Sequence, residues 1–136
     1  MSEHRYRHLQ TDVEKGVLVL TPSPSRLEGD DLAQQLVEET LAAVADAGAD
    51  KVVINLEHVE SLTSANFRPF LALRKQLKAS GGRLVLCNLS GSVLQAFQIT
   101  RLVSTAGSSS AFFESRPDVA SAVASLAGDP AADTTA

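Results

Sequence analysis

Two hydroxyl residues, Thr63 and Ser64, lie between a short apolar run and a segment whose apolar residues recur at helical spacing. This order predicts a loop that leads into a helix N-terminus, where backbone N–H groups lack internal partners and the helix dipole adds partial positive charge. Such a position suits an anion, including a phosphate carried by a serine. A phosphorylation switch and a plain helix-capping role are therefore both open for Ser64, and the two are compatible. From its position alone, we expect Ser64 to cap the helix.

The sequence offers little from which to assemble a catalytic or metal site. Its three histidines are His4, His8 and His58, and neither an HExxH motif nor a pair of cysteines accompanies them. His58 precedes Ser64 by six residues, but no GxSxG elbow or recognisable oxyanion device completes a hydrolase. Because glycine-rich phosphate loops are also absent, a nucleotide held at the helix N-terminus is a weaker alternative. We expect no enzyme activity, no cofactor and no metal.

Composition restricts the class of protein. With 136 residues and 44% hydrophobic residues, the chain is expected to form one domain with a modest core. A net charge of −4 disfavours nucleic acid as a direct partner, because phosphate binding needs a basic surface. The single cysteine, Cys87, lies in an apolar run and is expected to be a buried small hydrophobe. Since no apolar run is long enough to span a bilayer, we expect a cytoplasmic protein without membrane insertion.

Strands and helices are expected to alternate around the hydroxyl pair. We expect strands at residues 4–10, 16–22, 51–56, 83–87 and 111–113, and helices over 31–47, 65–80, 92–99 and 118–126. A loop is expected over 21–31. Asp30 or Asp31 is expected to cap the first helix, whereas Pro69 either lies in the first turn of the second helix or kinks it. This alternation predicts an α/β fold with parallel strands and crossover helices.

The segment VVINLEHVESLTSANF, residues 52–67, resembles the core motif of the STAS domain, the fold of bacterial anti-sigma factor antagonists. Further along, LRKQLKASGGRLVLCNLSGSVLQAFQITRL and AFFESRPDVASAV resemble the later helices and strands of that family. The resemblance implies a STAS-like mixed β-sheet with helices mainly on one face. It also implies a STAS-like domain over residues 1–127, and we expect residues 128–136 to form a disordered tail.

What the resemblance implies about function is partner switching. In this family the unphosphorylated antagonist binds a serine kinase that is also an anti-sigma factor, phosphorylation of one serine breaks the complex, and a phosphatase resets it. The matching serine is Ser64, so the resemblance makes Ser64 the expected phosphorylation site, with Thr63 as the second choice. Thr63 and Asn66 stand where the family often has Asp and Gly. We expect Asn66 to limit how closely a partner backbone approaches.

The residues expected to bind the partner are Asn55, His58, Thr63, Ser64, Ala65, Asn66 and Arg68. The alternative function is that of a non-switching STAS subunit in a transport or signalling complex. Dimer formation is left open by the sequence.

Overall fold

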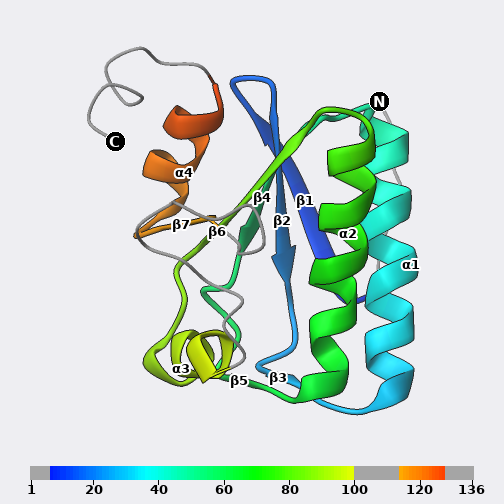
Figure 1. Ribbon diagram of the computed structural model, residues 1–136, viewed down its shortest axis with the longest axis vertical. Helices are drawn as coiled ribbons and strands as arrows, with labels where there is room; N and C mark the ends of the chain where they lie inside the picture. Colours follow the sequence, from blue (N-terminus) through cyan, green and yellow to red (C-terminus); the bar gives the residue numbers. More distant parts are fainter. Residues whose placement is uncertain (1–6, 100–113, 128–136) are drawn as a thin grey trace.

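A mixed sheet with helices on both faces forms the body of the protein (Figure 1). The structure is a computed structural model that describes residues 7–99 and 114–127. The five strands of the main sheet follow the spatial order β1 (Leu9–Glu14), β2 (Val17–Pro22), β4 (Lys51–Asn55), β6 (Arg83–Cys87) and β7 (Glu114–Arg116). β1 is antiparallel to β2, and the other neighbours are parallel. The predicted mixed α/β fold is confirmed.

The helices form two layers on either side of this sheet. They are α1 (Asp30–Ala47), α2 (Arg68–Ala79), α3 (Gly91–Ile99) and α4 (Val119–Leu126), with a 3₁₀ turn, η1 (Ser64–Phe67), directly before α2. α1 and α2 lie side by side on one face, and α4 lies on the other (Figure 1). The helices are therefore mainly on one face, as the resemblance implied.

Burial on both faces explains the uninterrupted apolar run of β4. Because side chains alternate across a strand, Val52 and Ile54 join the core beneath α1 and α2, whereas Val53 joins the smaller core beneath α4. Neighbouring β6 divides in the same way, with Leu84 on one side and Val85 on the other.

The first strand lies further along the chain than the sequence pattern indicated. β1 spans Leu9–Glu14 rather than residues 4–10, and residues 1–6 lie outside the described part. A two-residue turn joins β1 to β2, since Glu14 pairs with Val17. Lys15 and Gly16 in this turn have φ values of 52° and 78°, the left-handed conformations that a tight hairpin requires. The turn therefore sets the register of β1.

Two further predictions need correction. The expected loop over residues 21–31 contains a short strand, β3 (Arg26–Leu27), which pairs with β5 (Ser61–Leu62). The N-cap of α1 is Gly29, without a side-chain cap, so neither Asp30 nor Asp31 has the expected capping role. Both aspartates lie in the first turn instead, where their charge complements the helix dipole. The strand expected at 111–113 and the tail at 128–136 lie outside the described residues.

Candidate functional site

The hydroxyl pair lies where the small β3–β5 ladder meets the start of α2. The Thr63 N–H donates to the carbonyl oxygen of Leu27 at 2.9 Å, which continues the ladder by one residue. Ser64 is the first residue of η1, so the predicted position at a helix N-terminus is confirmed for its backbone. The side chain of Ser64 lies outside the described part of the structure. Pro69 lies in the first turn of α2, the first of the two alternatives.

Aromatic packing anchors η1 and the start of α2 to the core. Phe97 of α3 is fully buried and meets Phe67 and Phe70 edge-on, with ring centroids 4.9 and 5.4 Å apart. Edge-to-face pairs of this kind contribute about 0.5–1.5 kcal/mol each beyond the area they bury. The end of η1 and the beginning of α2 are therefore fixed to the core, which holds Ser64 at a defined place on the rim of the sheet.

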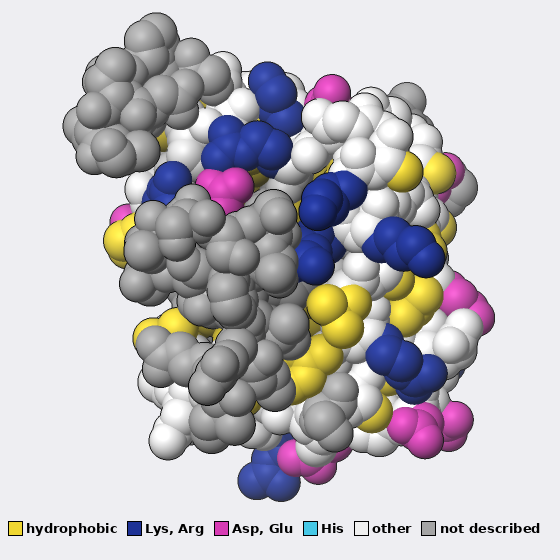
Figure 2. Space-filling model, in the orientation of Figure 1, with side chains coloured by type: hydrophobic (Ala, Val, Ile, Leu, Met, Phe, Trp, Pro, Cys, Tyr) yellow, Lys and Arg dark blue, Asp and Glu magenta, His cyan; other side chains and the backbone are white. Residues whose placement is uncertain are grey.

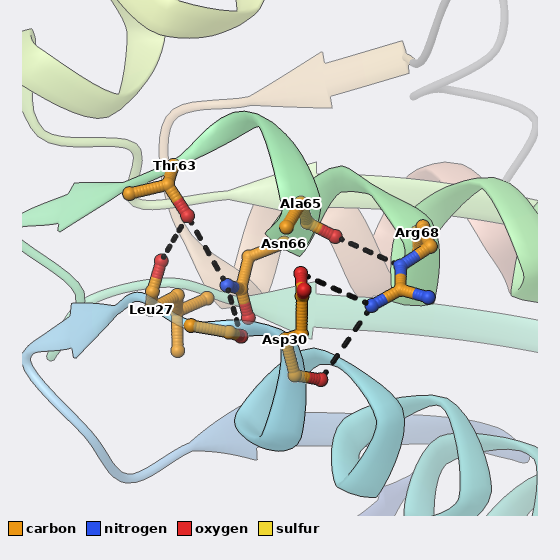
Figure 3. Close-up of polar contacts among 7 residues, drawn as sticks. Leu27, Asp30, Thr63, Ala65, Asn66 and Arg68 are labelled. Atoms are coloured by element: carbon orange, nitrogen blue, oxygen red, sulfur yellow. Dashed lines mark hydrogen bonds and ion pairs between the residues drawn. The ribbon is translucent and has the colours of Figure 1, made fainter.

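Asn66 is a buried residue that holds the turn in place by hydrogen bonds (Figure 3). Its side-chain amide donates to the carbonyl oxygen of Gly29 at 3.2 Å and to Thr63 Oγ1 at 3.3 Å, and its backbone N–H donates to the Thr63 carbonyl oxygen at 2.9 Å. Asn66 is completely buried, so the expectation that it would limit a partner's approach is wrong. Its Oδ1 has no hydrogen-bond partner among the described residues. Asn66 acts here as a brace between two helix starts.

Arg68 provides a second link between the same helix starts (Figure 3). Its Nε donates to the Ala65 carbonyl oxygen at 3.3 Å, and its guanidinium lies 3.7 Å from Asp30 Oδ1. The side chains of Arg68 and Asp30 are 50% and 86% exposed, so this ion pair adds little stability. The ion pair matters for position, because it holds the Arg68 guanidinium on the accessible side of the turn that begins at Ser64.

Asn55 belongs to a separate network at the end of β4. Its Oδ1 accepts from the Glu57 N–H at 3.2 Å and from the Asn88 amide at 2.9 Å, while its own amide donates to Glu57 Oε1 at 2.7 Å. The first bond spans two residues and forms a side-chain turn at Asn55. Asn55 is buried, whereas His58 is about half exposed and lies 3.7 Å from Glu57.

The structure thus divides the predicted partner-binding residues into two groups. Thr63, Ala65, Asn66 and Arg68 come together with the backbone of Ser64, and Asn55 and His58 lie in the neighbouring network. Sequence analysis did not place Gly29, Asp30 or Asn88 among the site residues, and it considered Asp30 only as a helix cap. Only the place of Asn88, directly after β6 as Asn55 ends β4, could have indicated it.

An open cleft lies beside the turn, at the start of α1. Its volume is about 600 Å³, and Glu28, Asp30 and Asp31 line it together with Gly29 and Leu32. All three carboxylates are exposed, so this part of the rim is acidic.

The described residues include neither an accessible thiol nor a cluster of metal-binding side chains. Cys87 is buried, as predicted, and burial raises the pKa of its thiol to about 12, with the negative charges of Asp118 and Glu57 adding to the effect. Within residues 7–99 and 114–127, no group of three or more His, Cys, Asp or Glu side chains is placed to hold a metal ion. The helices of the same ranges include none with the length and apolar character to cross a membrane.

Comparison with solved structures identifies the fold. A crystal structure of a Thermotoga maritima protein that is provisionally named an anti-sigma factor antagonist matches with a TM-score of 0.73 and 16% identity, over 89% of this chain and 96% of that chain. The Bacillus cell fate determinant SpoIIAA in its phosphorylated form matches with a TM-score of 0.55 and 18% identity, over 94% and 99%. SLC26A9 matches with a TM-score of 0.56 and 14% identity, over 89% of this chain and 20% of that one.

Sequence comparison assigns the family. BtrV of Bordetella bronchiseptica, provisionally named an anti-sigma factor antagonist, is 40% identical over 72 residues. That match covers 53% of this chain and 61% of BtrV, so the chain aligns with less than two thirds of this relative. The family model for the STAS domain matches residues 8–121, which include every residue of the turn and of the network around Asn55. The chain belongs to the STAS domain family.

Proposed function

We propose that this protein is an anti-sigma factor antagonist that acts by partner switching. In this proposal, the unphosphorylated protein binds a serine kinase that is also an anti-sigma factor, and phosphorylation of Ser64 breaks the complex. A phosphatase then restores the binding-competent form. The observation that carries the proposal is the position of Ser64 at the first residue of η1, in a turn fixed by Thr63 to Leu27 and by Asn66 to Gly29.

The braced turn supports a switch that works by charge alone. A phosphate adds roughly −1.5 to −2 charges at neutral pH. If the rim docks against a partner surface shaped for the neutral serine, that charge loses its water at the interface, and the partner offers no counterion for it. Burying an uncompensated charge costs several kcal/mol, enough to abolish a complex without any change of fold.

The predicted partner-binding residues have different roles in this proposal. Thr63, His58 and Arg68 are exposed, and Ala65 is half-buried, so these side chains contact the partner directly together with Ser64. Asn55 and Asn66 are buried and do not contact the partner. Asn55 holds the loop, and Asn66 holds the turn, in the shape that the partner recognises. The acidic cleft beside the start of α1 extends the same rim and favours a partner surface with basic side chains.

The likeness to SLC26A9 supports a second candidate function. A STAS-type fold occurs within that longer chain, of which this one covers 20%. The alternative is therefore a non-switching STAS subunit of a transport or signalling complex. In that case the partner would bind regardless of the chemical state of Ser64, and Ser64→Ala and Ser64→Asp would both be tolerated.

Paired pull-downs from a lysate of the native host separate the two functions. The baits are the wild type, Ser64→Ala, Ser64→Asp and Gln76→Glu, and captured proteins are identified by mass spectrometry. Gln76 is exposed near the other end of α2, so Gln76→Glu adds a negative charge away from the turn. Capture of a serine kinase by every bait except Ser64→Asp supports the switch. Equal capture of the same proteins by all four baits refutes it and favours the constitutive subunit.

A further inference from the structure

Charge is segregated between the two helices that cover one face of the sheet. α2 carries Arg68, Arg74, Lys75 and Lys78 and has no acidic residue, whereas α1 carries Asp30, Asp31, Glu38, Glu39 and Asp46 and has no lysine or arginine. Figure 2 shows lysine and arginine side chains over α2, and aspartate and glutamate side chains along the margin where α1 lies. Two adjacent helices thus present stripes of opposite sign.

The outward side of each helix follows from what the helix buries. α2 buries Pro69, Phe70, Leu73 and Leu77, so its opposite side bears Arg68, Leu71, Lys75 and Lys78, all exposed. α1 buries Ala33, Leu36, Thr40, Ala43 and Val44, so its opposite side bears Asp31, Gln34, Glu38, Ala42 and Ala45, also exposed. Leu71 is 38% exposed, which gives the basic stripe an apolar centre.

The two stripes also match in height. α1 and α2 run in the same direction (Figure 1), and the contacts of Arg68 with Asp30 and of Asn66 with Gly29 show that the two helices start close together. Both helices rise by about 1.5 Å per residue, and Lys75 and Glu38 lie seven and eight residues after Arg68 and Asp30, so these two side chains lie within about one helical turn of the same height. Within the described part of the chain, neither Lys75 nor Lys78 has an ion-pair partner.

We infer that the α1–α2 face binds a second copy of this chain about a two-fold axis parallel to the helices. Rotation about such an axis does not change the position of a residue along the helix direction. It brings the two subunits face to face with the sides of the helices exchanged, so α2 lies over α1 of the partner subunit. Lys75 then meets Glu38 of the partner subunit, and Leu71 lies near the level of the partner's Gln34. Two-fold symmetry makes each contact occur twice.

A second copy fits this face better than a uniformly charged partner does. An anionic membrane or a nucleic acid would meet the basic stripe but would be repelled by the acidic stripe beside it and by the net charge of −4. The face is two helices wide only along the 12 residues of α2, about 18 Å, which is small for a specific interface. The dimer is therefore expected to be weak, dependent on concentration and sensitive to salt.

Charge exchange between two variants tests the inference by sedimentation velocity at low ionic strength. Lys75→Glu places like charges at both contacts, and so does Glu38→Lys, so each variant alone should dimerise at least about tenfold more weakly than the wild type. An equimolar mixture restores opposite charges at both contacts and should form a heterodimer. Glu14→Lys, which changes an exposed residue of β1 by the same charge as Glu38→Lys, should dimerise like the wild type.

All three substitutions lie at exposed positions, and a thermal melt shows whether each variant is folded. Loss of the dimer can therefore be distinguished from loss of the fold. Recovery of the dimer only in the mixture, and its loss at high salt, supports the inference. A wild type that stays monomeric at the highest soluble concentration overturns it, and so does a folded mixture that stays monomeric. The proposed phosphorylation switch is not involved, since no partner and no phosphate are present.

Discussion

The side-chain amide of Asn66 donates a hydrogen bond to the carbonyl oxygen of Gly29, at 3.2 Å, and so joins the start of α2 to the start of α1. The two residues are 37 positions apart in the chain. Through this bond, the turn that begins at Ser64 and the N-cap of α1 form one unit. A disturbance at either helix start is therefore expected to reach the other.

Substitution of Asn66 tests this brace. We expect Asn66→Ala to lower the free energy of unfolding by about 1–2 kcal/mol, because two donated hydrogen bonds are lost and the Gly29 carbonyl oxygen loses a partner. Urea denaturation measures the change. Gln76→Ala, at an exposed position of the same helix, should stay within about 0.5 kcal/mol of the wild type. Equal stabilities for the two variants would show that the brace contributes nothing.

A close backbone approach makes Gly82 intolerant of a side chain. A Cβ at this position would lie 2.2 Å from the carbonyl oxygen of Asp50, and the backbone on both sides is fixed because the Arg83 N–H donates to that same oxygen. We expect Gly82→Ala to cost about 3 kcal/mol, measured by urea denaturation.

Gly91 is the matched control for this substitution. It begins α3, and a Cβ there has no neighbour within 4 Å, so Gly91→Ala should stay within about 0.5 kcal/mol of the wild type. If both alanine variants proved as stable as the wild type, the tight contact between Gly82 and Asp50 would be refuted.

The thiol of Cys87 is expected to be unreactive in the folded protein. Burial raises its pKa to about 12, against an ordinary 9.0, and so keeps the thiol protonated as well as out of reach. A thiol reagent at pH 8 should therefore label it only after denaturation in guanidinium. Rapid stoichiometric labelling of the native protein would contradict this account of the site.

The same raised pKa fixes the direction of a pH effect on stability. Above pH 9.0 the unfolded chain releases a proton that the folded protein retains, so this contribution to stability falls as pH rises from 9.0 toward 12. Cys87→Ala removes the titrating group. Stability measured against pH should therefore decline less steeply in this variant than in the wild type, and parallel curves would count against the shift.

Periodicity and turn chemistry were sufficient to predict most of the framework. Apolar runs predicted the strands β4 and β6, and uninterrupted runs of this kind are typical of a sheet that is covered on both faces. Helical spacing predicted a helix over residues 65–80, and Phe70, Leu73 and Leu77 lie on the buried side of α2. These features depend on residues close together in sequence, which explains why they can be recognised in a single chain.

Contacts between distant segments could not be predicted in this way. β3 and β5 have two residues each and exist because they pair across 35 positions, so neither has a periodic pattern of its own. The burial of Asn66 depends on the carbonyl oxygen of Gly29, which only the folded chain brings near. The candidate site was therefore predicted from its motif, whereas the structure was required to show which of its residues are exposed and which are buried.

The central claim is that a phosphate on Ser64 breaks the partner complex. Its most direct test uses the kinase identified in the pull-downs, purified and incubated with ATP and either the wild type or Ser64→Ala. Mass spectrometry locates the phosphate, and calorimetry compares the affinity of the kinase for the protein before and after modification. We expect a single phosphate on Ser64, none on Ser64→Ala, and at least about a hundredfold loss of affinity. A phosphate at another residue, or an affinity unchanged by phosphorylation of Ser64, would contradict the account.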